Sequence, residues 1–315
     1  MDKILNKGEM INNTYEVSFF IGAGSFGEVY RVKHKLMGLQ AMKVFKKEHF
    51  EQENIDEVIA EGKILIRLNH QNIVKVYDIN TFNKDDKEYY YITMSFVSGE
   101  SLAQLLKRKM QLDAPVAISI ITDILKGLKH ANENDLIAHR DISPDNILLS
   151  YDKHKPMGVI TDFGIAVLLD KNKKIAGAGG KFLYMAPESL SFDVTSQSSD
   201  VFAIGVVLYR ILTGVHPWEY DFENYDVSTP RSNMVEMISS TRRSKPKKPS
   251  LFNPSVSKNL DDIILKSLDR NMENRYRAAS ELFEALQNLD KDERPPSQTN
   301  IEDAYWEGQN LDSIF

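Results

Sequence analysis

The chain of 315 residues carries a formal net charge of −6 and no cysteine, and 42% of its residues are hydrophobic. That hydrophobic share is typical of a globular protein with one large domain or two packed lobes. The acidic balance indicates neither a nucleic-acid partner nor an anionic membrane surface. The absence of cysteine excludes a disulfide framework, a thiolate metal site and a catalytic thiol.

The N-terminal residues lack the apolar stretch of a signal peptide. The longest apolar run, around residues 201–212, is too short to cross a bilayer and reads as a buried helix. We therefore expect a cytoplasmic protein without a membrane partner.

Residues 15–45 alternate apolar and polar side chains around several glycines, which predicts strands joined by tight turns. A helix is expected over residues 56–68 and another strand over 89–97. From residue 98 the pattern becomes mainly helical, with short strands between loops. The expected helices span residues 114–132, 200–212, 259–268 and 278–289, and the expected short strands span 147–149 and 159–161.

These elements predict an α+β chain with a small β-rich lobe over residues 1–97 and a larger helical lobe over residues 98–290. A polar, acidic tail follows over residues 291–315. Its aromatic residues leave two interpretations open, disorder or docking onto the body of the protein or a partner.

The glycine-rich segment 22–27 (GAGSFG) lies between two strand-like stretches, whereas a dinucleotide-binding turn would be followed by a helix. Glycines let a backbone approach phosphate oxygens without obstruction by a Cβ atom. Lys43 lies on the next strand, and it follows the glycine-rich segment at the sequence distance that a phosphate-binding lysine requires. Glu57 and Glu61 lie one turn apart on the following helix, and both are candidates to hold this lysine. The spacing of the residues that follow favours Glu61.

One short loop, residues 139–146 (HRDISPDN), contains both Asp141 and Asn146, and Asp162 follows after a short strand. Phosphoryl transfer needs metal to neutralise the phosphates and a carboxylate to orient the attacking hydroxyl. One amide oxygen and one carboxylate for the metal, with a second carboxylate for the hydroxyl, are a sufficient set.

Together these motifs resemble the eukaryotic-type protein kinase family over roughly residues 15–290, and they occur in the family order. The order is the glycine loop, the strand lysine, the helix glutamate, HRD at 139–141, DFG at 162–164 and APE at 186–188. The resemblance implies a bilobal protein-kinase fold, ATP with Mg²⁺ (Mn²⁺ as an alternative metal), and Ser or Thr hydroxyls of protein substrates as acceptors. The chain looks like a bacterial or phage stand-alone member of this family.

The resemblance also assigns roles. Lys43 pairs with Glu61 and binds the α- and β-phosphates, Asp141 is the catalytic base, and Asn146 and Asp162 hold the metal. The implied nucleotide-binding residues are Ile21, Gly22, Gly24, Ser25, Phe26, Gly27, Val29, Ala41, Lys43, Met94, Ser95, Val97, Ser101, Asn146, Leu148 and Asp162. Met94 is the implied gatekeeper. Asp200 resembles the buried aspartate that anchors the backbone of the catalytic loop, and Glu188 and Arg275 resemble the family's buried ion pair. All three are expected to support the site without doing chemistry.

The sequence departs from the family pattern at two positions. Ser/Thr members usually carry Lys two residues after the catalytic Asp, and Thr three residues before the Tyr that precedes the APE segment. Here these positions are Ser143 and Lys181. Our hypothesis is that Lys181 supplies the missing charge from the opposite side, which places it among the catalytic residues. The alternative is that Ser143 is tolerated and Lys181 is merely exposed.

The activation segment between Gly164 and Tyr184 contains no Ser, Thr or Tyr. We therefore expect activity that does not depend on phosphorylation of this segment. A basic stretch over residues 242–248 favours a solvated loop over a docking site.

Three competing functions remain open. The first is a pseudokinase that acts as an ATP-binding scaffold, and the second is a dual-specificity or tyrosine kinase. The third is a small-molecule kinase of related fold, against which the APE segment, Asp200 and Arg275 argue.

Overall fold

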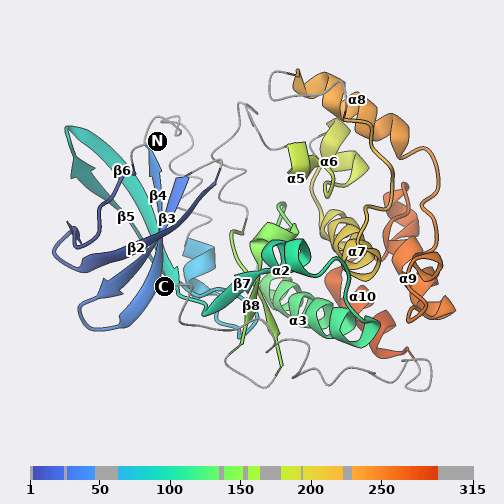
Figure 1. The fold of residues 1–315 in the computed structure, drawn as a ribbon, viewed down its shortest axis with the longest axis horizontal. Helices are drawn as coiled ribbons and strands as arrows, with labels where there is room; N and C mark the ends of the chain where they lie inside the picture. The colour runs from blue at the N-terminus through green and yellow to red at the C-terminus, as the bar shows by residue number, and fades with distance from the viewer. Residues whose placement is uncertain are drawn as a thin grey trace.

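The computed structural model of this chain describes residues 3–24, 27–46, 63–134, 138–151, 155–163, 179–192, 194–222 and 229–289. They form a six-stranded sheet followed by a mainly helical region (Figure 1). The predicted α+β organisation is confirmed. The predicted residues Glu57, Glu61, Ser25 and Phe26, the tail from residue 291 and residues 164–178 of the activation segment lie outside the described residues.

The sheet is antiparallel throughout, with the strand order β1-β2-β3-β4-β6-β5. Its strands are β1 (Met10–Ile11), β2 (Tyr15–Gly24), β3 (Gly27–His34), β4 (Gly38–Lys46), β5 (Val76–Lys84) and β6 (Lys87–Ser95). The hairpin between β5 and β6 turns through Asp85 and Asp86, whose φ angles are 49° and 56°. Two consecutive positive φ values are what a tight two-residue hairpin turn requires.

Strand β4 shows how the sheet directs side chains toward the site. Met42 and Val44 are buried in a cluster confined to the N-terminal segment and the sheet. Ala41 and Phe45 are buried instead in the large core that continues into the helical region. Because successive strand residues point to opposite faces, Lys43 lies on the same face as Ala41 and Phe45. Lys43, the predicted phosphate-binding lysine, therefore faces the helical region.

The helical region is organised around α7 (Gln197–Thr213), which is buried along nearly its whole length. It packs against α3 (Ala114–Glu133), α9 (Lys258–Ser267) and α10 (Ala279–Gln287), as Figure 1 shows on the side away from the sheet. A Cβ atom on Gly205 would lie 2.8 Å from the Cβ atom of Ser267, so glycine permits the close approach of α7 and α9. Within the described part, no helix is long and apolar enough to cross a membrane.

A small three-stranded sheet, in the order β7-β8-β9, lies between the large sheet and the helices. Its strands are β7 (Gly99–Ser101), β8 (Ile147–Ser150) and β9 (Met157–Ile160). Strand β8 begins directly after the loop that carries Asp141 and Asn146, and β9 ends two residues before Asp162. The antiparallel pairing of Ile147 with Ile160 therefore brings these two loops together.

Shorter elements complete the chain. They are α2 (Leu102–Arg108), η3 (Pro144–Asn146), α5 (Gly179–Phe182), α6 (Pro187–Phe192), α8 (Arg231–Thr241), η4 (Pro249–Leu251) and η5 (Met272–Asn274). Residues 63–67 are helical and belong to the helix predicted over 56–68. The four long helices predicted in the second half of the chain are confirmed within one to three residues at each end.

Candidate active site

Asp200 of α7 fixes the backbone of the loop at residues 139–146. Its carboxylate accepts hydrogen bonds from the backbone N–H of His139 at 2.6 Å and of Arg140 at 3.1 Å. Arg140 has a φ of 71°, a left-handed conformation that an ordinary side chain adopts only when its surroundings impose it. Burial raises the pKa of Asp200 to about 7, although both backbone hydrogen bonds favour its ionised form. The predicted anchoring role of Asp200 is confirmed.

His139 connects this loop to the segment after β9. Its Nε2 atom lies 3.0 Å from the carbonyl oxygen of Thr161, and its Nδ1 atom accepts a hydrogen bond from the N–H of Asp141. Burial lowers the pKa of His139 to about 4, so the ring is neutral and its Nε2–H donates to Thr161. The ring also lies 4.5 Å from that of Phe163. One side chain therefore sets the spacing between Asp141 and Asp162.

Asn146 holds the side chain of Asp141 in place. Its Nδ2 atom donates to the backbone oxygen of Asp141 at 2.7 Å and to the carboxylate Oδ2 at 2.8 Å. The short helical turn η3, which begins with Pro144, brings the two residues within reach. Since both donor bonds come from Nδ2, the amide oxygen of Asn146 makes no hydrogen bond with the rest of the described chain.

Asp162 lies across from this pair and contacts Lys43 from the large sheet. The Lys43 Nζ atom is 2.8 Å from Asp162 Oδ1, and Asp162 has a positive φ of 60°. Burial alone would raise the pKa of this carboxyl group, but the charge and hydrogen bond of Lys43 hold it below its usual value. Asp162 is therefore ionised, and Lys43 stands beside it. The predicted partner Glu61 lies outside the described residues.

The donor set fits Mg²⁺ and ATP. The ionised carboxylate of Asp162 and the unbonded amide oxygen of Asn146 are hard oxygen ligands of the kind that Mg²⁺ prefers. Bound Mg²⁺ would neutralise the phosphate charge of the nucleotide there. Lys43, on the adjacent strand, adds a cation beside the same carboxylate.

The predicted nucleotide-binding residues come from both sheets. Ala41 pairs with Met94 across β4 and β6, and Leu148 pairs with Ser101 across β7 and β8. The side chain of Ile21 is 46% exposed at the open edge. A cavity behind this region is lined by Lys43, Phe45, Leu65, Ile73, Val74, Val76, Ile92, Met94, Thr161, Asp162 and Phe163.

The predicted glycine loop lies where β2 ends and β3 begins. Gly22 pairs with Val29 and Gly24 with Gly27 across β2 and β3. A Cβ atom on Gly27 would come within 2.1 Å of the carbonyl oxygen of Val44, so no other residue fits at this position. The remaining predicted contacts, Ser95 and Val97, follow at the end of β6, and both are partly buried.

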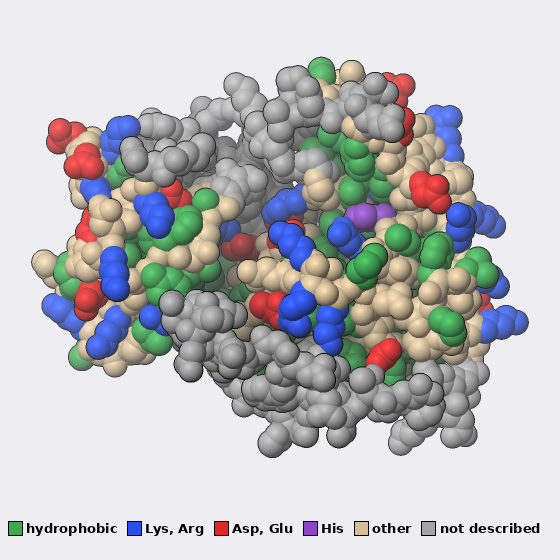
Figure 2. Space-filling view, in the orientation of Figure 1, with side chains coloured by type: hydrophobic (Ala, Val, Ile, Leu, Met, Phe, Trp, Pro, Cys, Tyr) green, Lys and Arg blue, Asp and Glu red, His purple; other side chains and the backbone are tan. Residues whose placement is uncertain are grey.

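Lys181 of α5 reaches the catalytic loop. Its Nζ atom lies 2.5 Å from Asp141 Oδ2, and both side chains are partly buried. Ser143, where the family usually has lysine, is 1% exposed, and its hydroxyl is buried without a hydrogen-bond partner among the described residues. Of the two departures found in the sequence, Lys181 contacts the carboxylate of Asp141, and Ser143 is buried in the same loop. Figure 2 shows basic and acidic side chains gathered in the hollow between the sheet and the helices.

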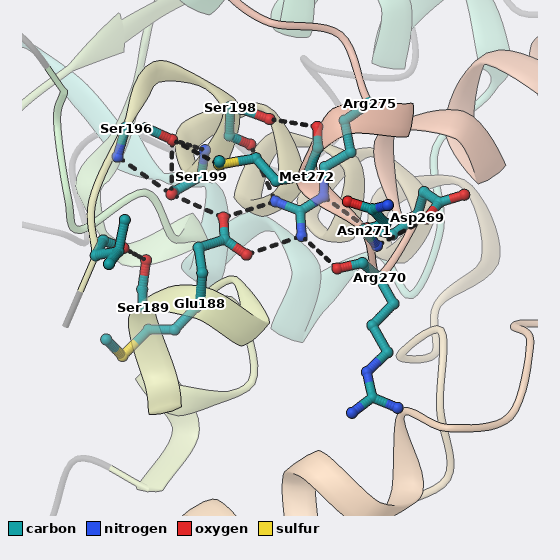
Figure 3. A network of polar contacts seen from close by, with 12 residues as sticks. Glu188, Ser189, Ser196, Ser198, Ser199, Asp269, Arg270, Asn271, Met272 and Arg275 are labelled. Carbon is teal, nitrogen blue, oxygen red and sulfur yellow. Dashed lines mark hydrogen bonds and ion pairs between the residues drawn. The ribbon is translucent and has the colours of Figure 1, made fainter. Parts of the chain in front are cut away.

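Glu188 and Arg275 form the ion pair that the sequence predicts. The guanidinium group binds both carboxylate oxygens, at 2.7 Å and 2.9 Å (Figure 3). Ser199 of α7 donates a further hydrogen bond to Glu188 at 2.9 Å. The start of α6, which carries Glu188, is thereby tied to the helical core.

Arg242, which follows α8, contacts the loop after Lys181. It is 4% exposed, so the prediction of a solvated loop is wrong for this residue. Its guanidinium donates to the carbonyl oxygens of Phe182, Leu183 and Met185 at 3.3, 2.7 and 2.5 Å. The other four basic residues of the stretch, Arg243, Lys245, Lys247 and Lys248, are exposed as predicted.

Comparison with known proteins agrees with this geometry. The sequence matches the protein kinase domain family over residues 15–286, which is most of its length. The chain therefore belongs to the protein kinase family. The predicted resemblance and the bilobal protein-kinase fold are confirmed.

Bacterial serine/threonine kinases are among its relatives. The probable serine/threonine-protein kinase CPE1738 of Clostridium perfringens is 32% identical over 293 residues, covering 90% of this chain and 39% of the relative. PrkC of Bacillus subtilis is 29% identical over 282 residues, covering 87% and 40%. Serine/threonine-protein kinase pkn3 of Myxococcus xanthus is 30% identical over 296 residues, covering 91% and 52%. The chain thus spans about half or less of the length of these relatives.

Among solved structures, the PknI kinase domain of Mycobacterium tuberculosis superposes with a TM-score of 0.66 at 24% sequence identity. The match covers 90% of this chain and 98% of that domain. At this identity the likeness shows the fold.

Proposed function

We propose that this chain is a cytoplasmic, Mg-ATP-dependent protein kinase that transfers the γ-phosphate of ATP to Ser or Thr hydroxyls of proteins, itself included. The observation that carries the proposal is the 2.5 Å contact between Lys181 and Asp141. It places a cation at the carboxylate that must receive the acceptor hydroxyl, in a catalytic loop that lacks its usual lysine.

In this reaction the acceptor oxygen attacks the γ-phosphorus, its proton passes to Asp141, and ADP leaves. Asn146 and Lys181 both bond to Asp141 Oδ2 and orient the carboxylate. The ammonium group of Lys181 then stabilises the negative charge on the phosphoryl group in transfer, which is the task of the missing loop lysine. Lys43 and Asp162 serve the nucleotide side of the site.

The test compares kcat for four enzymes, the wild type, Lys181→Thr, Ser143→Lys and the double variant. Loss of one charge aimed at the transition state costs about 10²–10³ in rate, so we expect a drop of that order for Lys181→Thr. Adding Ser143→Lys to this variant should raise kcat again by at least about tenfold, because a lysine is then present on the catalytic loop. An unchanged kcat for Lys181→Thr would refute the relocation of the charge.

Two controls separate this test from general effects. Lys247→Thr removes a lysine whose ion pair with Glu219 is exposed, and its kcat should match that of the wild type. Asp141→Asn should abolish transfer of radiolabel from ATP. If the wild type shows no more transfer than Asp141→Asn, the ATP-binding scaffold is the correct reading and the kinase proposal fails.

We also propose that activity does not require phosphorylation of the activation segment. The support is the absence of Ser, Thr and Tyr between Gly164 and Tyr184, since a loop switch of that kind needs an acceptor hydroxyl. Protein prepared free of phosphate should phosphorylate a substrate without a lag. Analysis of the phosphorylated amino acids in the product tests the specificity, and phosphotyrosine would favour the dual-specificity or tyrosine alternative.

A further inference from the structure

Arg210, near the end of α7, lies beside the loop that carries Lys181. Its NH1 group lies 2.7 Å from the hydroxyl oxygen of Tyr184 and 2.6 Å from His216 Nε2, and donates to both. No other hydrogen bond of the guanidinium is found within the described chain, and its remaining N–H groups are not buried. The group therefore presents free donors to solvent while its position is fixed by two neighbours.

Within the described part of the chain, no carboxylate is paired with the positive charge of Arg210. Burial lowers the pKa of His216 to about 3, and the nearby charges of Arg210 and Arg242 lower it further, so His216 is neutral and accepts the hydrogen bond. Although the chain has a net charge of −6, this guanidinium has no carboxylate partner among the residues that the structure describes.

The position adjoins the place where the acceptor residue must lie. Tyr184 follows Lys181 by three residues, and Lys181 contacts Asp141. Burial raises the pKa of Tyr184 to about 12; Arg210 opposes this rise, and the carboxylate of Asp145 in the catalytic loop adds to it. The Tyr184 hydroxyl is therefore within electrostatic reach of the catalytic loop on one side and bonded to Arg210 on the other.

We propose that Arg210 forms a subsite for an acidic side chain of the protein substrate, a few residues from the phosphorylated Ser or Thr. This inference rests on the proposed function. A guanidinium binds a carboxylate or phosphate through parallel N–H donors, and the free donors of Arg210 suit that geometry. Asp145, whose charge acts on Tyr184, is exposed and carries the opposite charge. The preference for an acidic side chain is therefore confined to the substrate positions that lie over Arg210.

The experiment uses peptides with a single Ser, in which each flanking position in turn is Glu, Gln, Lys or phosphoserine. For the wild type we expect kcat/KM to be about three- to tenfold higher with Glu than with Gln at one or two positions, the range of one charge-assisted contact. The preference should vanish in Arg210→Gln and turn toward Lys in Arg210→Glu, with the KM for ATP unchanged. The phosphoserine arm shows whether a carboxylate or a phosphate is the better occupant.

Two further variants control for indirect effects. Arg243→Gln removes an exposed arginine after α8 and should keep the wild-type preference. Tyr184→Phe removes the hydroxyl that Arg210 binds but keeps the guanidinium, and it should also keep the preference. A wild type without acidic preference, or one whose preference survives in Arg210→Gln, overturns the subsite and leaves the kinase proposal standing. A wild type that phosphorylates neither the peptides nor casein overturns both.

Discussion

Two buried arginines hold the two ends of the segment 182–188, and they do so in different ways. Arg275 binds the carboxylate of Glu188 at the C-terminal end, with its side chain 0% exposed. Arg242 binds backbone carbonyl oxygens at the N-terminal end and the hydroxyl of Tyr220, at 2.9 Å. Both guanidinium groups lie over the ring of Phe202, at 4.9 Å and 5.2 Å from its centroid.

The difference shows two solutions to the burial of a cation. Arg275 has a counter-charge, so its desolvation is offset by an ion pair with two hydrogen bonds. Among the described residues, Arg242 bonds only to neutral oxygen acceptors, and it lies against the aromatic faces of Phe202, Trp218 and Tyr220. Loss of a partner should therefore be most costly at Arg275, because a full charge would be left unpaired.

The largest expected effect is that of Glu188→Ala. This change leaves the Arg275 guanidinium buried without its counter-charge, and breaking such a pair costs about 3–5 kcal/mol of unfolding free energy. Urea unfolding followed by tryptophan fluorescence measures it. The double variant Glu188→Ala/Arg275→Met should recover part of the loss, since no unpaired charge remains. A single-variant cost below about 1 kcal/mol would contradict the buried ion pair.

A smaller effect is expected for Arg242→Met, because this change removes the buried charge together with its bonds. The carbonyl oxygens of Phe182, Leu183 and Met185 lose their donors, and we expect a loss of about 2–3 kcal/mol. Since these oxygens lie directly after Lys181, the KM for a peptide substrate should rise while the KM for ATP stays unchanged.

Arg243→Met is the matched control for this variant. Arg243 is the next residue in the chain and is exposed, so its substitution should change stability by less than about 0.5 kcal/mol. Equal effects of the two substitutions on stability and on peptide KM would show that Arg242 does not position the loop.

The contrast between the two arginines also marks what the sequence could predict. The family resemblance implied the Glu188–Arg275 pair and the anchoring role of Asp200, and both contacts are confirmed. Both ends of those contacts are chemically distinctive side chains. Arg242 was missed because its loop acceptors are backbone carbonyls some 60 residues earlier, and any sequence supplies carbonyls. A run of basic residues gives no signal for which member is buried.

The fold also contains a strand that the sequence did not predict. Strand β5 (Val76–Lys84) was not predicted, because its Asp and Asn residues are disfavoured in strands and its alternation is weak. Antiparallel pairing with β6 makes this segment a strand, although its local sequence does not indicate one. The hypothesis that Lys181 supplies a charge at the catalytic loop arose only because two departures from one family pattern, Ser143 and Lys181, stood at positions that meet in the family. The contact of Lys181 with Asp141 itself was not predicted.

The smallest expected effect is that of low pH on stability. Low pH should weaken the Glu188–Arg275 ion pair and leave the hydrogen bonds of Arg242 intact. Burial alone would raise the pKa of Glu188, but the hydrogen bonds and charge of Arg275 hold it below the ordinary value of 4.5. Because the folded pKa lies below the unfolded one, the pair contributes stability that is fully present above about pH 4.5 and is lost as the pH falls through the folded value. The carbonyl acceptors of Arg242 do not titrate.

Unfolding free energies from about pH 6 down to about pH 3 test this difference. The gap between the wild type and Glu188→Gln should shrink as the pH falls, because Gln has no carboxyl group to protonate. The gap between the wild type and Arg242→Met should stay constant over the same range. If the first gap is as constant as the second, Glu188 is not held ionised by Arg275, and the two arginines bury their charge in the same way.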